Sequence, residues 1–306
     1  MAKVLLATDK PFAPVAVSGI RDIIEVAGME LVLLEKYTEK KQLLDAVKTV
    51  DAIIIRSDII DEEVLNAASR LKIIVRAGAG YDNIDLDAAT ARNVCVMNTP
   101  GQNANAVAEL VFGMLIYNIR NNFNGTSGTE LKDKKLGILA YGNVGRNVAR
   151  IAKGFGMDIY AYDAFASAQI IANDGVKALD SAEELFRNCQ IISLHIPATT
   201  QTRNSINYSL MNSMPKGAII VNTARKEIID EKALAQIFAD RNDFKYLTDI
   251  LPGIDAELKA AYPDRYLAMP KKTGAQTAEA NINAGIAAAK QIVDYILNGN
   301  QQFRVN

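Results

Sequence analysis

The sequence has few cysteines, little net charge and no long apolar run, and each absence excludes a class of protein. Its two cysteines, Cys95 and Cys189, lie far apart in apolar stretches, which indicates buried thiols in a reducing compartment and not a disulfide scaffold or metal site. The 34 basic and 35 acidic residues give a net charge of -1 without a charged block, so no nucleic acid or anionic membrane partner is predicted. No segment reaches the roughly 18 apolar residues of a membrane span. Small molecules are the expected partners.

The length of the chain and its N-terminal sequence indicate how it is organised. Its 306 residues exceed what one hydrophobic core usually holds, which predicts two domains. The apolar run of MAKVLLATDK is too short for a signal peptide, and Asp9 and Lys10 end it. We therefore expect a soluble, cytoplasmic protein.

Short β-branched runs alternate with amphipathic segments almost from end to end. The first set includes KVLLAT, ELVLLE and DAIIIR, and the second includes LGILAY, QIISLHIP and GAIIVNTA. Long helices are expected from about Gln102 to Ile119 and from about Thr277 to Leu297. This alternation is typical of parallel sheets covered by helices. The fold class predicted is α/β, with two doubly wound parallel-sheet domains of Rossmann-like or flavodoxin-like type.

A glycine turn joins one strand to the next helix in LGILAYGNVGRNVARIAKGFG. The turn carries Gly142, Asn143, Val144 and Gly145, and Asp163 ends the following strand. Backbone N–H groups at such a turn hold a pyrophosphate, and an acid about 20 residues on accepts from ribose hydroxyls. The pattern predicts dinucleotide binding, and the carboxylate favours NAD over NADP. The alternative is a glycine turn of an ordinary α/β protein.

The fingerprint departs from its usual form at its first glycine, where this chain has Ala140. A non-glycine residue in the left-handed region costs roughly 1 to 2 kcal/mol. We therefore expect Ala140 to keep a negative φ.

Three stretches resemble the D-isomer-specific 2-hydroxyacid dehydrogenases. They are AYGNVGRNVARIAKGFGMDIYAYD, CQIISLHIPATTQTRNSINYSLMNSMPKGAIIVNTARKEIIDEKAL and RAGAGYDNIDLDAATARNVCVMNTPGQNANAVAELVFGML. The resemblance implies a substrate-binding domain of residues 1–98 plus 275–306 and an NAD-binding Rossmann domain of residues 99–274. Catalysis would take place in a cleft that closes to exclude water.

The resemblance also implies functions for single residues. Arg225 corresponds to the arginine that grips the substrate carboxylate, a task that suits a planar guanidinium, and its alternative is a surface salt bridge. Asp249 matches the acid that holds the nicotinamide carboxamide, and a helix or turn cap is its alternative. Further cofactor contacts are implied for His195, Pro197 and Thr223. The loop RAGAG supplies Gly78, Ala79 and Gly80, whose backbone approaches the substrate carboxylate.

The stretch IIIRSD resembles the site at which phosphoglycerate dehydrogenases of this family meet their substrate. Arg56 at the end of an apolar strand suits a phosphate, with Ser57 beside it, although an ordinary strand-end charge is the alternative. The predicted reaction is the oxidation of D-3-phosphoglycerate to 3-phosphohydroxypyruvate in serine biosynthesis.

The chain lacks the histidine and the acid that the family uses for proton transfer. Lys271 follows Pro270 where the histidine would stand, and Ile254 lies near the place of the glutamate. A lysine with a pKa lowered from about 10.4 by a nearby arginine and by burial is a suitable general acid/base. We predict that Lys271 transfers the proton. If the match to the family is shifted by one residue, Lys272 transfers the proton instead. The alternative is that both lysines are solvated loop residues without a catalytic role.

Other functions and assemblies stay open at this point. The alternatives are a glyoxylate or hydroxypyruvate reductase and a non-catalytic NAD-sensing protein like the corepressors of the family. The resemblance implies a homodimer formed through the helix near Gln102 to Ile119 and its flanks. No C-terminal regulatory domain, and hence no feedback by serine through one, is expected. The prediction includes no metal.

Overall fold

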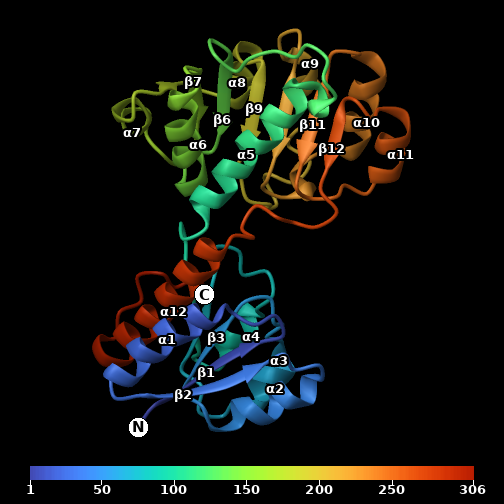
Figure 1. The fold of residues 1–306 in the computed structure, drawn as a ribbon. Helices are drawn as coiled ribbons and strands as arrows, with labels where there is room; N and C mark the ends of the chain where they lie inside the picture. The colour runs from blue at the N-terminus through green and yellow to red at the C-terminus, as the bar shows by residue number, and fades with distance from the viewer. The chain divides into compact units, whose positions relative to one another are not determined.

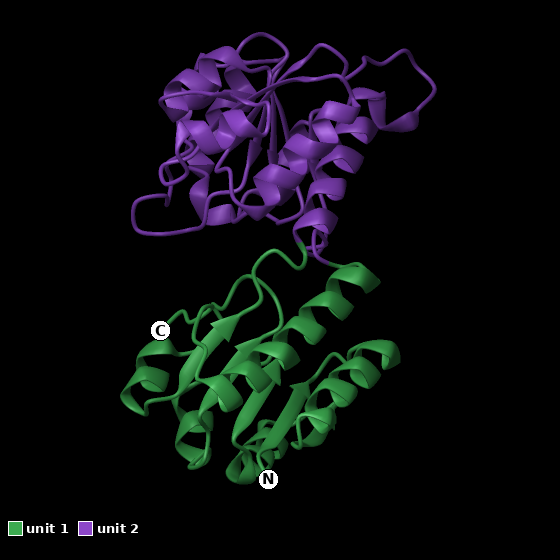
Figure 2. Cartoon of the chain, turned by 90° about the vertical axis from the view of Figure 1, so that its left-hand side faces the viewer, with its two compact units in different colours: residues 1–103, 276–306 green, residues 104–275 purple.

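A computed structural model describes residues 1–306 and divides the chain into two units. Unit 1 comprises residues 1–103 and 276–306, and unit 2 comprises residues 104–275 (Figure 2). Each unit is an all-parallel sheet with helices on both faces, as predicted for doubly wound domains (Figure 1). None of the helices has both the length and the apolar character that a membrane crossing requires.

Unit 1 has a five-stranded sheet in the order β2-β1-β3-β4-β5, the flavodoxin-like order. Its strands are β1 (Lys3–Thr8), β2 (Glu30–Glu35), β3 (Ala52–Ile55), β4 (Ile73–Arg76) and β5 (Cys95–Asn98). Its helices are α1 (Pro14–Val26), α2 (Lys40–Ala46), the 3-10 helix η1 (Val47–Thr49), α3 (Glu62–Ala67), α4 (Leu86–Ala91) and α12 (Ala278–Asn298).

The two apolar faces of this sheet are buried by different helices. One face packs against α1 and α12, and the other packs against α2, α3 and α4. Gly19 of α1 lets α12 come close, because a Cβ atom at this residue would lie 2.5 Å from the Ile286 Cδ1 atom. The C-terminal helix thus docks on the first domain, as the sequence suggested, and lies beside α1 (Figure 1).

Local signals in the sequence set several helix starts. The Asp61 side chain accepts from the N–H of Val64 and is the N-cap of α3. Thr277 caps α12 in the same way by accepting from the N–H of Ala280. Both cysteines are free and buried, as predicted.

Unit 2 has a seven-stranded sheet in the order β12-β11-β10-β9-β6-β7-β8. Its strands are β6 (Lys135–Leu139), β7 (Asp158–Tyr162), β8 (Lys177–Ala178), β9 (Ile191–Leu194), β10 (Ile219–Asn222), β11 (Lys245–Thr248) and β12 (Tyr266–Ala268). Its helices are α5 (Ala104–Ile119), η2 (Asn121–Phe123), α6 (Asn143–Gly154), α7 (Ala168–Asn173), α8 (Ala182–Asn188), α9 (Tyr208–Ser213), η3 (Lys226–Ile228), α10 (Glu231–Asp240) and α11 (Asp255–Ala261).

The strand order of unit 2 determines where a ligand can bind. Helices α5, α6 and α7 cover one face of the sheet, and α8 to α11 cover the other. The order reverses between β6 and β9, because the chain first runs outward through β7 and then returns to β9. Ligands of open parallel sheets bind at the carboxyl ends of the strands at such a switch point.

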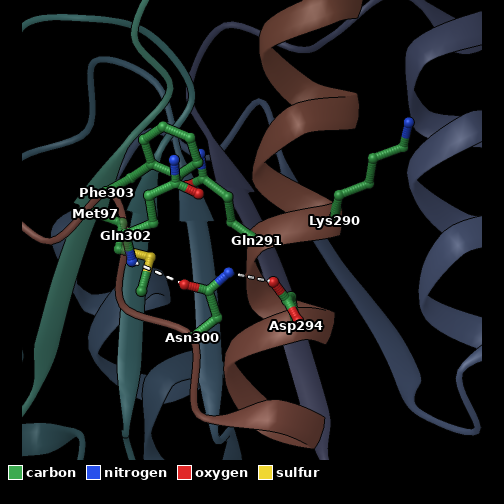
Figure 3. A pocket seen from close by; sticks show the side chains of 7 residues that line it. All are labelled: Met97, Lys290, Gln291, Asp294, Asn300, Gln302 and Phe303. Carbon is green, nitrogen blue, oxygen red and sulfur yellow. Dashed lines mark hydrogen bonds between the residues drawn. The ribbon is translucent and has the colours of Figure 1, made fainter.

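A small cavity of about 170 Å³ lies in unit 1 where the chain leaves α12 (Figure 3). The Asn300 amide donates to Asp294, and its carbonyl oxygen accepts from the backbone N–H of Gln302. These bonds turn the chain back toward β5, where the N–H of Val305 donates to the carbonyl of Val96. None of the predicted site residues lines this cavity.

Candidate active site

The predicted glycine turn connects β6 to α6 and serves two separate purposes. Gly145 is needed for packing, since a Cβ atom there would lie 2.3 Å from the Ala140 carbonyl oxygen. Gly142 is the N-cap residue of α6 at an ordinary φ of -81°, and a Cβ atom there would meet nothing within 4 Å. Neither packing nor backbone strain therefore explains Gly142. A glycine here leaves room for a ligand at the helix N-terminus.

Ala140 contradicts the expectation that its φ is negative. Its φ is +76°, in the left-handed region. The N–H of Ala140 donates to the Tyr162 carbonyl, and its own carbonyl lies against Gly145, so the turn is held from both sides. The close approach of α6 to β6 thus imposes the conformation of the absent glycine on an alanine.

Asp163 follows β7 and faces the glycine turn. One carboxylate oxygen accepts from the N–H of Tyr141 at 2.6 Å, and the other accepts from the N–H groups of Phe165 and Ala166 at 2.7 and 2.8 Å. Burial raises the pKa of Asp163, but these three N–H donors outweigh it and hold the pKa below its ordinary value. The acid is therefore ionised at neutral pH and fixed beside the turn.

Two of the predicted site residues in unit 2 have a buried side-chain atom without a hydrogen-bond partner in the protein. Asp249 is fully buried, and its Oδ2 atom accepts from the N–H groups of Thr273 and Gly274, whereas its Oδ1 atom accepts from none. The Oγ1 atom of Thr223 is likewise buried and unpaired. Burial raises the pKa of Asp249, despite the N–H donors and the nearby charge of Lys272. An unpaired buried acceptor calls for a donor from a ligand.

His195 follows β9, and its Nε2 atom lies 2.8 Å from the Ser193 hydroxyl. Burial lowers its pKa to about 3, so the ring is neutral over the physiological range. The histidine is thus a poor proton donor at neutral pH. Pro197 lies exposed further along the same loop, where its carbonyl accepts from the Thr202 hydroxyl.

The turn after β10 holds Arg225 through a residue that the sequence reasoning missed. Asn222 is fully buried, and its side chain accepts from the N–H of Ala224 and donates to the Arg225 carbonyl and the Tyr246 hydroxyl. An Asn that satisfies both ends of a turn fixes its geometry. The stretch NTARKE contains this residue, but its arrangement is visible only in three dimensions.

Two cations meet at the carbonyl of Ala224. The Arg225 Nη1 atom donates to it at 2.9 Å, and the Lys272 Nζ atom donates to it at 3.0 Å. Lys271 is exposed, and its ammonium group makes no hydrogen bond or ion pair. The structure therefore brings Lys272, and not Lys271, to the arginine.

In unit 1, Arg56 lies at the carboxyl end of β3. Its Nη2 atom donates to the Asn281 side chain at 2.5 Å, its Nη1 atom donates to the Lys10 carbonyl at 3.3 Å, and the guanidinium lies 5.1 Å from the Phe12 ring centroid. Burial lowers the pKa of Arg56, against the charges of nearby carboxylates. Ser57 beside it is exposed.

Asp58 organises the backbone around this arginine. Its buried carboxylate accepts from the N–H groups of Asp9 and Arg56 and from the Tyr37 hydroxyl. These bonds join the ends of β1, β2 and β3, so the Arg56 side chain leaves the sheet from a fixed position.

The glycine loop after β4 is held in place by β5 and by Arg76. Gly78 has a φ of +152°, and its N–H donates to the Arg76 carbonyl. The carbonyls of Gly78 and Ala79 accept from the N–H of Thr99 and the amide of Asn98. The N–H groups of Ala79 and Gly80 make no backbone bond, so they, and not that of Gly78, are available to a substrate.

Arg76 is a second residue that the sequence reasoning missed. Its Nε atom donates to the Arg56 carbonyl at 2.9 Å. A Cβ atom at Gly78 would lie 1.5 Å from the Arg76 Nη1 atom, so the guanidinium fills the space beside the loop. An arginine at the end of β4, next to RAGAG in the sequence, was the available signal.

The residues of unit 2 fit NAD. The open face at Gly142 admits a pyrophosphate at the start of α6, and Asp163 is an ionised acceptor for ribose hydroxyls. The unpaired Oδ1 atom of Asp249 is a ready acceptor for the amide of a nicotinamide. A carboxylate at Asp163 would repel the 2'-phosphate of NADP.

Comparison with known proteins agrees with this geometry. Residues 114–265 match the model of the D-isomer specific 2-hydroxyacid dehydrogenase NAD-binding domain. A hydroxypyruvate reductase of Thermotoga maritima is 35% identical over 281 residues, which are 86% of this chain and 90% of the relative. A D-3-phosphoglycerate dehydrogenase of Methanocaldococcus jannaschii is 34% identical over 94% of this chain and 56% of the relative. This chain thus spans about half the length of that relative.

A solved structure extends the similarity to the whole chain. The NAD⁺-bound 3-phosphoglycerate dehydrogenase of Entamoeba histolytica is 48% identical, with a TM-score of 0.90, over 100% of this chain and 98% of that one. Sequence identity, coverage and the glycine turn therefore agree, and the chain belongs to the D-isomer specific 2-hydroxyacid dehydrogenase family, with NAD as its cofactor.

Proposed function

We propose that this protein oxidises D-3-phosphoglycerate to 3-phosphohydroxypyruvate, as a step in serine biosynthesis. The observation that carries the proposal is the meeting of Arg225 and Lys272 at one carbonyl, because the reaction needs a carboxylate grip and a proton carrier together. The names of the relatives from Methanocaldococcus jannaschii and Entamoeba histolytica support the choice of substrate.

The chain's own residues divide the chemistry between them. NAD, when bound, supplies the hydride acceptor. Arg225 holds the carboxylate of the hydroxy acid and polarises the adjacent carbon. Lys272 in its neutral form accepts the proton of the 2-hydroxyl group, and its ammonium form returns a proton to the carbonyl oxygen in the reverse direction.

The phosphate contacts would come from unit 1. Arg56 is held by Asn281 and the Asp58 turn, and Ser57 is exposed beside it. The N–H groups of Ala79 and Gly80 would meet the substrate carboxylate. Of the candidate substrates, only a phosphorylated one has a phosphate for Arg56 to bind.

Two lysine variants test the proposed proton transfer. Lys272→Met should lower kcat by roughly 100- to 10,000-fold, since a general acid/base usually contributes that much. Lys271→Met is the matched control and should change kcat by less than about threefold, because its side chain is solvated. The measurement is the oxidation of NADH by 3-phosphohydroxypyruvate over a range of pH. A large loss of kcat in Lys271→Met with little change in Lys272→Met would show that Lys271 transfers the proton, as its position after Pro270 predicts.

A reductase of hydroxypyruvate is the second candidate, supported by the name of the Thermotoga maritima relative. Turnover of 3-phosphohydroxypyruvate, hydroxypyruvate and glyoxylate with NADH distinguishes the two. Fast turnover confined to the phosphorylated substrate supports the main proposal. Faster turnover of hydroxypyruvate supports the reductase, and NADH binding without any turnover supports an NAD-sensing protein.

We also propose a homodimer formed through α5 and its flanks. α5 is apolar along most of its length, and Leu110 and Ile116 of this helix are only partly buried. Sedimentation velocity should give twice the 33.2 kDa of one chain at micromolar concentration. A species of 33.2 kDa that persists at high concentration would contradict this assembly.

A further inference from the structure

An aromatic ring is presented to solvent beside the carboxylate of the cofactor site. Phe165 is 98% exposed, the highest fraction among the exposed large hydrophobic side chains of the chain. It lies between β7 and α7, two residues after Asp163. A ring that contacts no protein adds nothing to the core, so its packing does not explain an aromatic residue at this position.

The backbone of Phe165 is fixed although its ring is not. Its N–H donates to Asp163 Oδ1 at 2.7 Å, and the other oxygen of that carboxylate accepts from the N–H of Tyr141 in the glycine turn at 2.6 Å. Ser167 then starts α7 by accepting from the N–H of Ile170. The carboxylate thus joins the glycine turn to the turn that carries the ring.

We infer that Phe165 stacks on the adenine of NAD and is a determinant of cofactor affinity. If Asp163 accepts from the ribose hydroxyls, as its place in the dinucleotide fingerprint implies, the base attached to that ribose would lie toward the residues that follow β7, where the Phe165 N–H donates to Asp163. A base stacks on an exposed aromatic ring without needing further hydrogen bonds. The exposed side chain of Ile170 on the first turn of α7 adds a second apolar surface there. This inference rests on the NAD site of unit 2 and not on the choice of substrate.

The test measures binding directly, by isothermal titration with ADP-ribose, which contains the adenosine part, and by fluorescence titration with reduced nicotinamide mononucleotide, which lacks it. Phe165→Ala should weaken ADP-ribose binding by about 5- to 100-fold, the usual range for one base stacked on an aromatic ring. Binding of the mononucleotide should not change. Phe165→Tyr should restore ADP-ribose affinity to within about threefold, because it keeps the ring, whereas Phe165→Leu should not.

Val26→Ala is a control, since it shortens another exposed apolar side chain, at 89% exposure, in the unit that does not hold the cofactor site. It should leave ADP-ribose affinity unchanged. Unchanged ADP-ribose affinity in Phe165→Ala would overturn the inference. Equal weakening of both ligands would overturn it as well, since the ring would then act on the unit as a whole and not on the base.

Discussion

At the scale of single residues, Ala140 adopts a conformation that its side chain disfavours. Its φ of +76° is forced by the close packing of α6 on β6, and nothing in the glycine turn relieves it. The same strain would not arise with a glycine, which adopts positive φ freely. The alanine therefore makes the turn less stable than a glycine would.

Ala140→Gly should raise the free energy of unfolding by about 1 kcal/mol, because it removes the left-handed strain. Chemical denaturation measures the change. Gly28→Ala is the reverse control, since Gly28 has a φ of +74° with nothing within 4 Å of a Cβ atom, and it should lose about 1 kcal/mol. A loss of stability in Ala140→Gly would show that the methyl group packs usefully.

His195 links stability to pH. Its folded pKa is lowered by burial from 6.5 to about 3, so the unfolded chain takes up a proton first as the pH falls. The contribution of His195 is therefore complete above pH 6.5 and is lost between pH 6.5 and about 3.

As the pH falls from 6.5 to about 3, this effect should lower the free energy of unfolding by at most about 1.4 kcal/mol per pH unit. His195→Gln should reduce the slope between pH of about 6.5 and 5, where most carboxylates remain ionised. Since the chain has a single histidine, no other imidazole contributes. An unchanged slope in the variant would mean that His195 titrates normally in the folded protein.

At the scale of elements, the glycine turn separates a structural glycine from a ligand-binding one. Gly145→Ala should lower the free energy of unfolding by about 1 to 3 kcal/mol, because its methyl group would press on the Ala140 carbonyl. Gly142→Ala should unfold like the parent protein but bind NADH at least about tenfold more weakly, since the methyl group occupies the pyrophosphate space.

Thermal unfolding and NADH fluorescence measure the two effects on the same samples. Loss of stability in Gly142→Ala would assign that glycine to packing instead. Unaltered stability in Gly145→Ala would mean that α6 can shift away from β6.

Most elements follow from patterns in the sequence, because long apolar periods and capping residues act locally. The helix ends at Asp61 and Thr277 illustrate this, since each cap needs only its own next three residues. The conformation of Ala140 does not follow from local preference. Packing against Gly145, several residues away, overrides it.

At the scale of the whole molecule, the proposed function assigns phosphate recognition to unit 1 and the cofactor to unit 2. Arg56→Ala should raise the KM for 3-phosphohydroxypyruvate at least about tenfold and change that for hydroxypyruvate little, because one charge-assisted phosphate contact is lost. Its affinity for NADH should equal that of the parent protein. Steady-state kinetics with both substrates, beside an NADH titration, is the measurement. Equal rises in KM for both substrates would show that Arg56 does not bind the phosphate.

By itself, the sequence determined the fold class, the cofactor turn and the family, because these depend on short motifs and on apolar periods that survive without knowledge of contacts. It also named Arg225, Asp249 and Asp163. Only the tertiary structure decided which atoms meet. It placed Lys272 on the Ala224 carbonyl, made Asn222 the support of that turn, and left one oxygen of Asp249 unpaired. Such contacts join residues that are far apart in the sequence, and the local sequence does not determine which of them come close in space.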